Sequence, residues 1–197
     1  MPGHWEEKQA IEKGDTTIDQ NTAPPWGHLS GGGGAKTDIM VGDHLLEKPA
    51  SPVAHNFGPQ ATPMQALERY KQVLRQHIKD PDLGLYSPRT REFLRQWVVT
   101  NAQQDNGLRG LEKAIQNAET VVEGSLAVIR FPVSDRQASP YFLEKDDQGW
   151  MLDFFSMNQL IRFNHKNQWH FMKTEHKFAF AFTDLSFDKH GFPHKRR

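Results

Sequence analysis

Asp153 and Arg130 each place one charge in an otherwise apolar strand pattern, and they are the residues of this chain best suited to chemistry. In the strand that ends at Asp153, alternation puts Trp150 and Leu152 on one face, and Met151 and Asp153 on the other. Large apolar groups on both faces predict a strand that is covered on each side. A carboxylate there needs a hydrogen-bond donor or a cation, because its charged form is otherwise strongly disfavoured.

Arg130 lies near the end of the clearest strand pattern, residues 120 to 131, which Pro132 stops. One face of this predicted strand carries Val122, Leu126, Val128 and Arg130. If the strand neighbours the one that ends at Asp153, Arg130 is the natural partner of that acid. We favour an ion pair that fixes the sheet, and the alternative is a pair that orients a substrate.

A predicted hairpin over residues 140 to 155 positions Asp153. Its turn is the cluster Asp146, Asp147, Gln148 and Gly149, which offers side-chain hydrogen bonds to the backbone and a glycine that tolerates positive φ. After the hairpin, Ser156 and Gln159 have the spacing of a capping box and predict a short helix. A strand through Leu160, Arg162 and Asn164 is the alternative for this segment.

Helices are predicted ahead of the sheet. Thr62, Pro63 and Gln65 form a start signal for a helix that runs to about His77, and Ser87-Pro88 starts a second one. The apolar stripe of the second helix is Phe93, Leu94, Trp97 and Val98. Thr100 and Gln103 repeat the box spacing, but Gly107 and Gly110 weaken the segment, so we expect a bend near residues 100 to 107 and a short helix after it.

Phe178, Phe180 and Phe182 alternate with small residues and predict a further strand, whose aromatic row is core, a pocket lining or a dimer contact. Together these elements predict an α+β domain, with N-terminal helices packed on a curved, mainly antiparallel sheet, over residues 62 to 197. Residues 1 to 61 are predicted to be a flexible Gly/Pro-rich tail, with two apolar islands at Pro25-Trp26 and Ile39 to Val41. The stretch from Ser30 to Thr37 lacks the two glycines of a phosphate-binding loop.

Composition excludes several function classes. The chain has no cysteine, which rules out disulfides and thiol chemistry. Residues 1 to 61 carry four Lys/Arg and eight Asp/Glu, a balance of −4, against 20 and 16, or +4, for the rest, so we expect no nucleic-acid footprint. No apolar run is long enough to span a membrane, and a soluble, cytoplasmic protein is the default expectation. His165, His170 and His176 lack metal-ligand spacing, so we expect neither a metal nor a cofactor.

Helices first, then a strand, a hairpin carrying Asp-Gln-Gly-Trp150 and later sheet resembles the NTF2-like superfamily over about residues 62 to 187. Ketosteroid isomerases, SnoaL-like cyclases and many non-enzymatic binding domains share this cone-shaped fold. The resemblance implies a curved sheet around a long helix, a pocket at the open end and frequent dimerisation. The helix proposed at Ser156 departs from the usual long strands.

Two functions follow from the resemblance. The first is a non-catalytic binding or assembly domain for a small apolar ligand or a protein partner, with Arg130, Tyr141, Trp150 and His170 as pocket residues. The second is a small-molecule isomerase or cyclase, in which Asp153 is the base and Tyr141 or His170 donates to the oxyanion. We expect the first.

Overall fold

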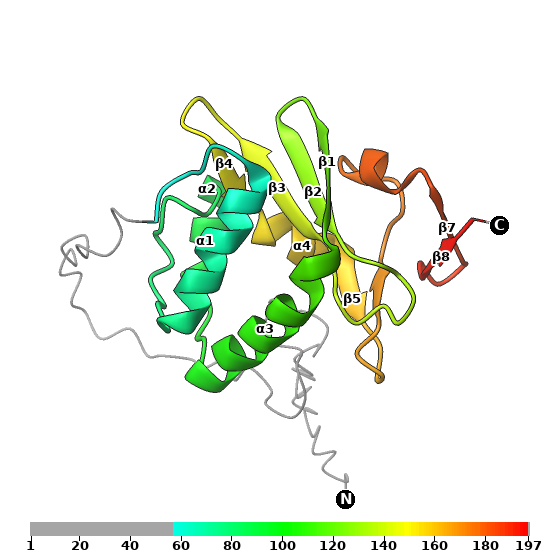
Figure 1. Cartoon of the computed structure of the whole chain (residues 1–197), viewed down its shortest axis with the longest axis horizontal. Coiled ribbons are helices and arrows are strands. Elements are labelled where there is room, and N and C mark those ends of the chain that lie inside the picture. Colours follow the sequence, from blue (N-terminus) through cyan, green and yellow to red (C-terminus); the bar gives the residue numbers. More distant parts are fainter. Residues whose placement is uncertain (1–56, 197) are drawn as a thin grey trace, which may run out of the picture.

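The computed structural model describes residues 57–196 as an α+β fold, which confirms the predicted class (Figure 1). The helical part comes first and comprises α1 (Pro63–Arg75), α2 (Pro88–Leu94), α3 (Asn101–Ala114) and the short 3-10 helix η3 (Ile115–Asn117). The first sheet contains β1 (Glu119–Glu123), β2 (Leu126–Arg130), β3 (Tyr141–Lys145) and β4 (Trp150–Leu152). The C-terminal part comprises α4 (Phe154–Leu160), β5 (Ile161–Phe163), β6 (Trp169–Phe171), η4 (Ala179–Phe182), β7 (Leu185–Phe187) and β8 (Pro193–Lys195).

The predicted starts of the helices ahead of the sheet are confirmed. Thr62 with Gln65, and Thr100 with Gln103, each form a complete capping box, and Ser87 caps α2. The predicted bend at residues 100 to 107 is wrong, because α3 runs unbroken from Asn101 to Ala114 through both glycines. Glycine costs a helix about 1 kcal/mol relative to alanine, which is less than the packing of an amphipathic helix supplies. The chain breaks earlier, after Leu94, so Trp97 and Val98 lie beyond the end of α2.

Residues 120 to 131 are two strands rather than the one predicted. β1 and β2 pair antiparallel across Gly124 and Ser125, and Gly124 has a φ of 58°. A two-residue hairpin turn with glycine first matches the twist of the strands that it joins. The turn shifts the alternation by one residue, because Glu123 lies opposite Leu126 and Val122 lies opposite Ala127. Val122 therefore does not share a face with Leu126, Val128 and Arg130, and that part of the prediction is wrong.

The predicted hairpin of β3 and β4 is confirmed, with Leu143 opposite Leu152 and Lys145 opposite Trp150. The Asp146 carboxylate accepts hydrogen bonds from the N–H groups of Gln148 (2.8 Å) and Gly149 (3.1 Å), and the φ of Gly149 is 140°. β4 is buried at all three residues, as its two apolar faces predicted.

The four-stranded sheet, in the order β1-β2-β3-β4, is covered by different parts of the chain on its two faces. On one face Tyr141 contacts Tyr70 of α1 at 6.1 Å between ring centroids, so this is the helix face. On the other face Phe142 stacks on Phe178 at 4.2 Å, so this is the C-terminal face. Figure 1 shows α1 and α3 lying in front of the sheet, with the C-terminal strands to the right.

The aromatic row from Phe178 to Phe182 is not a strand, and that prediction is wrong. Ala179–Phe182 forms the 3-10 helix η4, which buries Phe182 against Phe171 of β6, with 5.1 Å between the ring centroids. A strand buries every second residue, and a 3-10 helix buries every third. The first residue of the row is buried in either case, so its burial does not distinguish a strand from a 3-10 helix. The aromatic residues are core, which is one of the alternatives that the sequence left open.

The fold begins on the N-terminal side of Thr62, which corrects the start of the predicted domain. Phe57 is buried, and Gln60 exchanges backbone hydrogen bonds with Trp150 at 3.0 and 2.7 Å. Gln60 therefore forms a single antiparallel bridge at the edge of the sheet beside β4. The rest of the predicted tail, with its two apolar islands and the stretch from Ser30 to Thr37, lies outside the described residues.

Candidate functional site

A pocket of about 550 Å³ lies between α3, the segment from Phe131 to Ser139 and the helix face of the sheet. We call it the large pocket. Its wall on one side is α3, where Gly107, Gly110 and Ala114 present little or no side chain. It is lined by Tyr70, Gly107, Gly110, Leu111, Lys113, Ala114, Asn117, Phe131, Pro132, Ser134, Asp135, Gln137, Ala138, Ser139, Tyr141, Phe163 and Asn167.

Aromatic rings form the inner part of the large pocket. Tyr141 lies 6.1 Å from Tyr70 and 6.2 Å from Phe131, measured between ring centroids. Burial raises the pKa of Tyr70 well above its ordinary value, with the neighbouring Tyr141 and Tyr86 adding to the effect, and burial also raises the pKa of Tyr141. Both phenols are therefore neutral at any physiological pH, so they bring no charge to the pocket.

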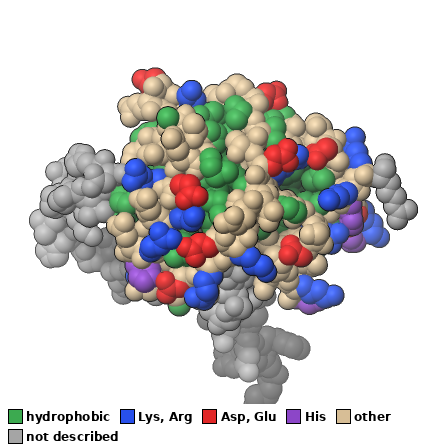
Figure 2. All heavy atoms as spheres, viewed as in Figure 1, with side chains coloured by type: hydrophobic (Ala, Val, Ile, Leu, Met, Phe, Trp, Pro, Cys, Tyr) green, Lys and Arg blue, Asp and Glu red, His purple; other side chains and the backbone are tan. Residues whose placement is uncertain are grey.

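The outer part of the large pocket is polar, with amides and hydroxyls from Asn117, Ser134, Gln137 and Ser139. Two charged residues, Lys113 and Asp135, are exposed there, and the Asp135 carboxylate accepts a hydrogen bond from the Gln137 N–H at 3.0 Å. The face of the molecule that carries α1 and α3 mixes both signs of charge with exposed apolar atoms (Figure 2). The pocket is thus suited to an apolar body with polar groups at its outer end.

Asp153 caps α4 and faces away from the large pocket. One of its oxygens accepts the Ser156 N–H at 2.9 Å, and the other lies 3.1 Å from the Lys177 ammonium. Its side chain is 3% exposed, and Lys177 also lies 3.6 Å from Glu144. As alternation predicted, Asp153 shares its side of the hairpin with Met151, whose cross-strand neighbour is Glu144, and this is the C-terminal face. The predicted acid is therefore buried and has a cation, but the helix begins at Phe154, two residues before the predicted start.

The predicted pair of Arg130 with Asp153 is wrong. Arg130 donates to Glu119 at 2.8 Å, to Asp184, and to the carbonyl of Ala181 at 2.6 Å. Burial opposes the charged form, but the hydrogen bonds to Asp184 and Glu119 raise the pKa of Arg130 overall. Arg130 and Asp153 lie on the same face of the sheet, yet η4 and the segment before it supply each with a separate partner. Arg130 therefore ties β1 and β2 to η4.

Trp150 and His170 lie away from the large pocket as well. Trp150 is buried under the Lys145 ammonium, which is 5.7 Å from the ring centroid. His170 pairs with Arg162 across β5 and β6, and its ring lies 4.7 Å from Phe192. Of the five residues that the sequence nominated, only Tyr141 lines the large pocket.

The residues that sequence reasoning missed are those contributed by α3 and by the segment after β2. Gly107 and Gly110 were read as helix-weakening residues, although small residues on a helix also leave room for a ligand beside it. Tyr70 belongs to the apolar stripe of the first predicted helix. Its hydroxyl group was the signal in the sequence that it could line a pocket instead. Within residues 57–196, no group of three His, Asp or Glu side chains is arranged to hold a metal ion, and no helix is long and apolar enough to cross a membrane.

Comparison of the chain with models of protein families, with curated proteins and with solved structures found no match in any of the three.

Proposed function

We propose that the domain is a non-catalytic binding module that holds a small, largely apolar ligand in the large pocket. The observation that carries this proposal is the composition of the pocket, with aromatic rings inside and amides and hydroxyls outside, in a volume of about 550 Å³. Small-molecule sites in proteins commonly have this composition and volumes of roughly 300 to 1,000 Å³.

An NTF2-like fold is part of the same proposal. Two features support it: α1 and α3 precede an antiparallel sheet, with α1 packed on one face of it and α3 packed on α1, and the pocket opens between α3 and that face. One feature departs from it, because α4 interrupts the sheet after β4 and the later strands form separate two-stranded ladders. An experimental structure with the sheet curved around α1 would support the assignment, and a flat sheet would contradict it.

An isomerase or cyclase with Asp153 as its base is the competing function. It requires the acid to reach a ligand that also contacts Tyr141. The two residues lie on opposite faces of the sheet, and both Asp153 oxygens already have partners. Binding without proton abstraction by Asp153 is therefore the function that we favour.

Titration with N-phenyl-1-naphthylamine, a neutral apolar dye that fluoresces when it leaves water, tests the proposal. Ala114 lines the large pocket, so Ala114→Trp places an indole in that space. We expect saturable dye binding to the wild-type chain and affinity at least about tenfold lower in Ala114→Trp, because the added ring competes for the volume that the dye needs.

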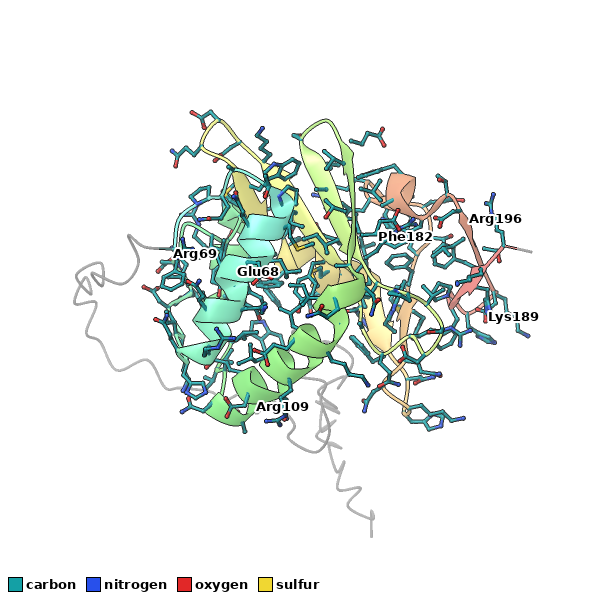
Figure 3. The ribbon with its side chains drawn as sticks, in the orientation of Figure 1. Glu68, Arg69, Arg109, Phe182, Lys189 and Arg196 are labelled. Atoms are coloured by element: carbon teal, nitrogen blue, oxygen red, sulfur yellow. The ribbon has the colours of Figure 1, made fainter. Side chains whose placement is uncertain are left out.

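The matched control is Arg109→Trp. Arg109 lies on the same helix, but it is exposed and points away from the body of the molecule (Figure 3). This variant adds the same side chain to α3 without entering the pocket, so it should bind the dye as the wild type does. Equal affinities in the two variants, or no saturable binding to the wild type, would rule out the large pocket as the site.

A further inference from the structure

Aromatic side chains gather on the surface where α2 meets the start of α4. The Phe93 ring lies 5.5 Å from the Trp97 ring and 6.2 Å from the Phe155 ring, measured between centroids. The Arg89 guanidinium lies 4.2 Å from the centroid of the Phe155 ring. None of the three aromatic side chains is buried, and Val98, which follows Trp97, is 51% exposed. We call these five residues the aromatic patch, and the proposed function does not use it.

The composition and shape of the aromatic patch are those of an interaction surface. Aromatic residues and arginine are enriched in protein interfaces, where they contribute most of the binding energy. Trp97 and Val98 also line a hollow of about 200 Å³. Because a cavity of about 150 Å³ holds benzene, this hollow has room for one leucine or methionine side chain. The patch is therefore suited to an apolar segment that inserts a side chain beside Trp97.

Positive charge surrounds the aromatic patch. Residues 88 to 98 contain three arginines and one glutamate, a balance of +2. Within the described residues Arg95 forms an ion pair with Asp82, whereas Arg89 and Arg91 form none. Charge complementarity steers binding and suppresses partners of like charge, so the patch favours an acidic partner. A second copy of the same patch is disfavoured, because it carries the same balance of +2.

The chain itself contains an acidic, apolar segment. Residues 38 to 47 include three acids and no Lys or Arg, a balance of −3. We call them the Asp38 segment, which lies outside the described residues. Its large apolar residues are Ile39, Met40, Val41, Leu45 and Leu46. The segment thus has both the apolar side chains and the charge that the aromatic patch requires.

The Asp38 segment is close enough along the chain to reach the patch. The Phe57 carbonyl accepts the Leu85 N–H at 2.7 Å, so the described chain begins beside the segment that leads into α2 (Figure 1). From Leu85 to Arg89 the chain spans at most about 14 Å, whereas residues 48 to 56 span up to about 30 Å when extended. A short tether gives effective concentrations in the millimolar range, so weak contacts are enough to populate the docked state.

We propose that the Asp38 segment docks on the aromatic patch of the same chain. Its apolar side chains cover the exposed rings, and one of them enters the hollow beside Trp97. Its carboxylates lie beside Arg89 and Arg91, so docking weakens as salt screens these charges.

A spin label on the full chain tests the proposal. Because the chain has no cysteine, one introduced cysteine carries the only label. A nitroxide on Gly42→Cys, inside the Asp38 segment, should broaden the backbone amide NMR signals of residues 93 to 98 and of Phe155 more than any others. The matched control is the same label on Gly14→Cys, which should not favour the patch. Equal broadening of the patch by both labels, or broadening by the Gly42→Cys label centred elsewhere, would overturn the proposal.

Two further measurements establish which chain docks and through which residues. Broadening of an isotope-labelled, nitroxide-free chain by a separate spin-labelled chain would place a second copy on the patch and overturn docking within one chain. In the labelled chain, Val98→Asp adds a like charge, so broadening at the patch should fall at least about twofold. Val122→Asp is its control, because Val122 is 52% exposed on β1, and it should change nothing. Equal effects of the two substitutions, or broadening unchanged at about 0.5 M salt, would contradict the proposal.

Discussion

His176 is a half-buried imidazole whose surroundings disfavour its protonated form. Its Nδ1 accepts the Phe178 N–H at 3.2 Å, so the neutral ring carries its proton on Nε2, which is buried without a partner among residues 57–196. The ring lies 4.6 Å from that of Phe171 and 6.0 Å from that of Phe142. Burial, with Lys173 nearby, lowers the pKa of His176 to about 4.

This lowered pKa predicts that acid destabilises the fold. Between about pH 6.5 and pH 4 the unfolded chain binds a proton at His176 that the folded chain does not, so the free energy of unfolding falls as pH falls. The slope from this one group is at most about 1.4 kcal/mol per pH unit. Urea unfolding at pH 7, 6 and 5 should show this loss in the wild type and a smaller one in His176→Phe. His190→Phe, at an exposed site, should behave as the wild type; equal slopes in all three proteins would contradict the assignment.

Asp153 contributes mainly as a helix cap. Asparagine caps a helix about as well as aspartate, and Lys177 is 45% exposed, so Asp153→Asn should cost less than about 1 kcal/mol of unfolding free energy. Asp153→Ala loses the cap and leaves the Ser156 N–H buried without its partner, which should cost about 2 kcal/mol or more. Urea denaturation distinguishes the two. Equal losses in the two variants would show that the carboxylate charge, and not the cap, is what matters.

At the scale of elements, two glycines at hairpin turns offer a matched comparison. Gly149 has a φ of 140°, and a Cβ there would lie 2.5 Å from the Gln60 carbonyl oxygen. Gly124 has a φ of 58° and no atom within 4 Å of the corresponding position. We expect Gly149→Ala to lose at least about 2 kcal/mol of stability, and Gly124→Ala about 1 kcal/mol, because only the first adds a clash to the unfavourable φ. Thermal unfolding measures both, and a larger loss at Gly124 would contradict the packing of Gln60 against β4.

Local signals explain which elements the sequence predicts. The capping boxes at Thr62 and Thr100, and the turn at Asp146, depend on residues within three positions of one another, and all three are found in the structure. The aromatic row at Phe178 and the turn at Gly124 were misread, because their patterns fit two structures and tertiary packing decides between them. The predicted bend at Gly107 and Gly110 is absent because the packing of α3 outweighs the low helix propensity of glycine.

At the scale of the whole molecule, the resemblance implied a pocket, but of the residues that line the large pocket it named only Tyr141. Its lining comes from α1, α3, the segment after β2, β3 and β5, and no spacing pattern connects these segments. Alternation did predict that Asp153 and Trp150 lie on opposite faces of the sheet. It did not predict that α3 lies over the face that carries Tyr141. The large pocket is therefore on one side of the sheet and Asp153 is on the other.

We propose that the large pocket, and not Asp153, is the functional site. Titration of the full chain with N-phenyl-1-naphthylamine, followed by backbone amide NMR, tests it most directly. We expect the largest shift changes at Gly107 and Gly110 of α3 and at Asn167, which line the pocket from two separate segments of the chain. Largest changes at the Ser156 amide, which donates to Asp153, would contradict it and return Asp153 to the centre of the function.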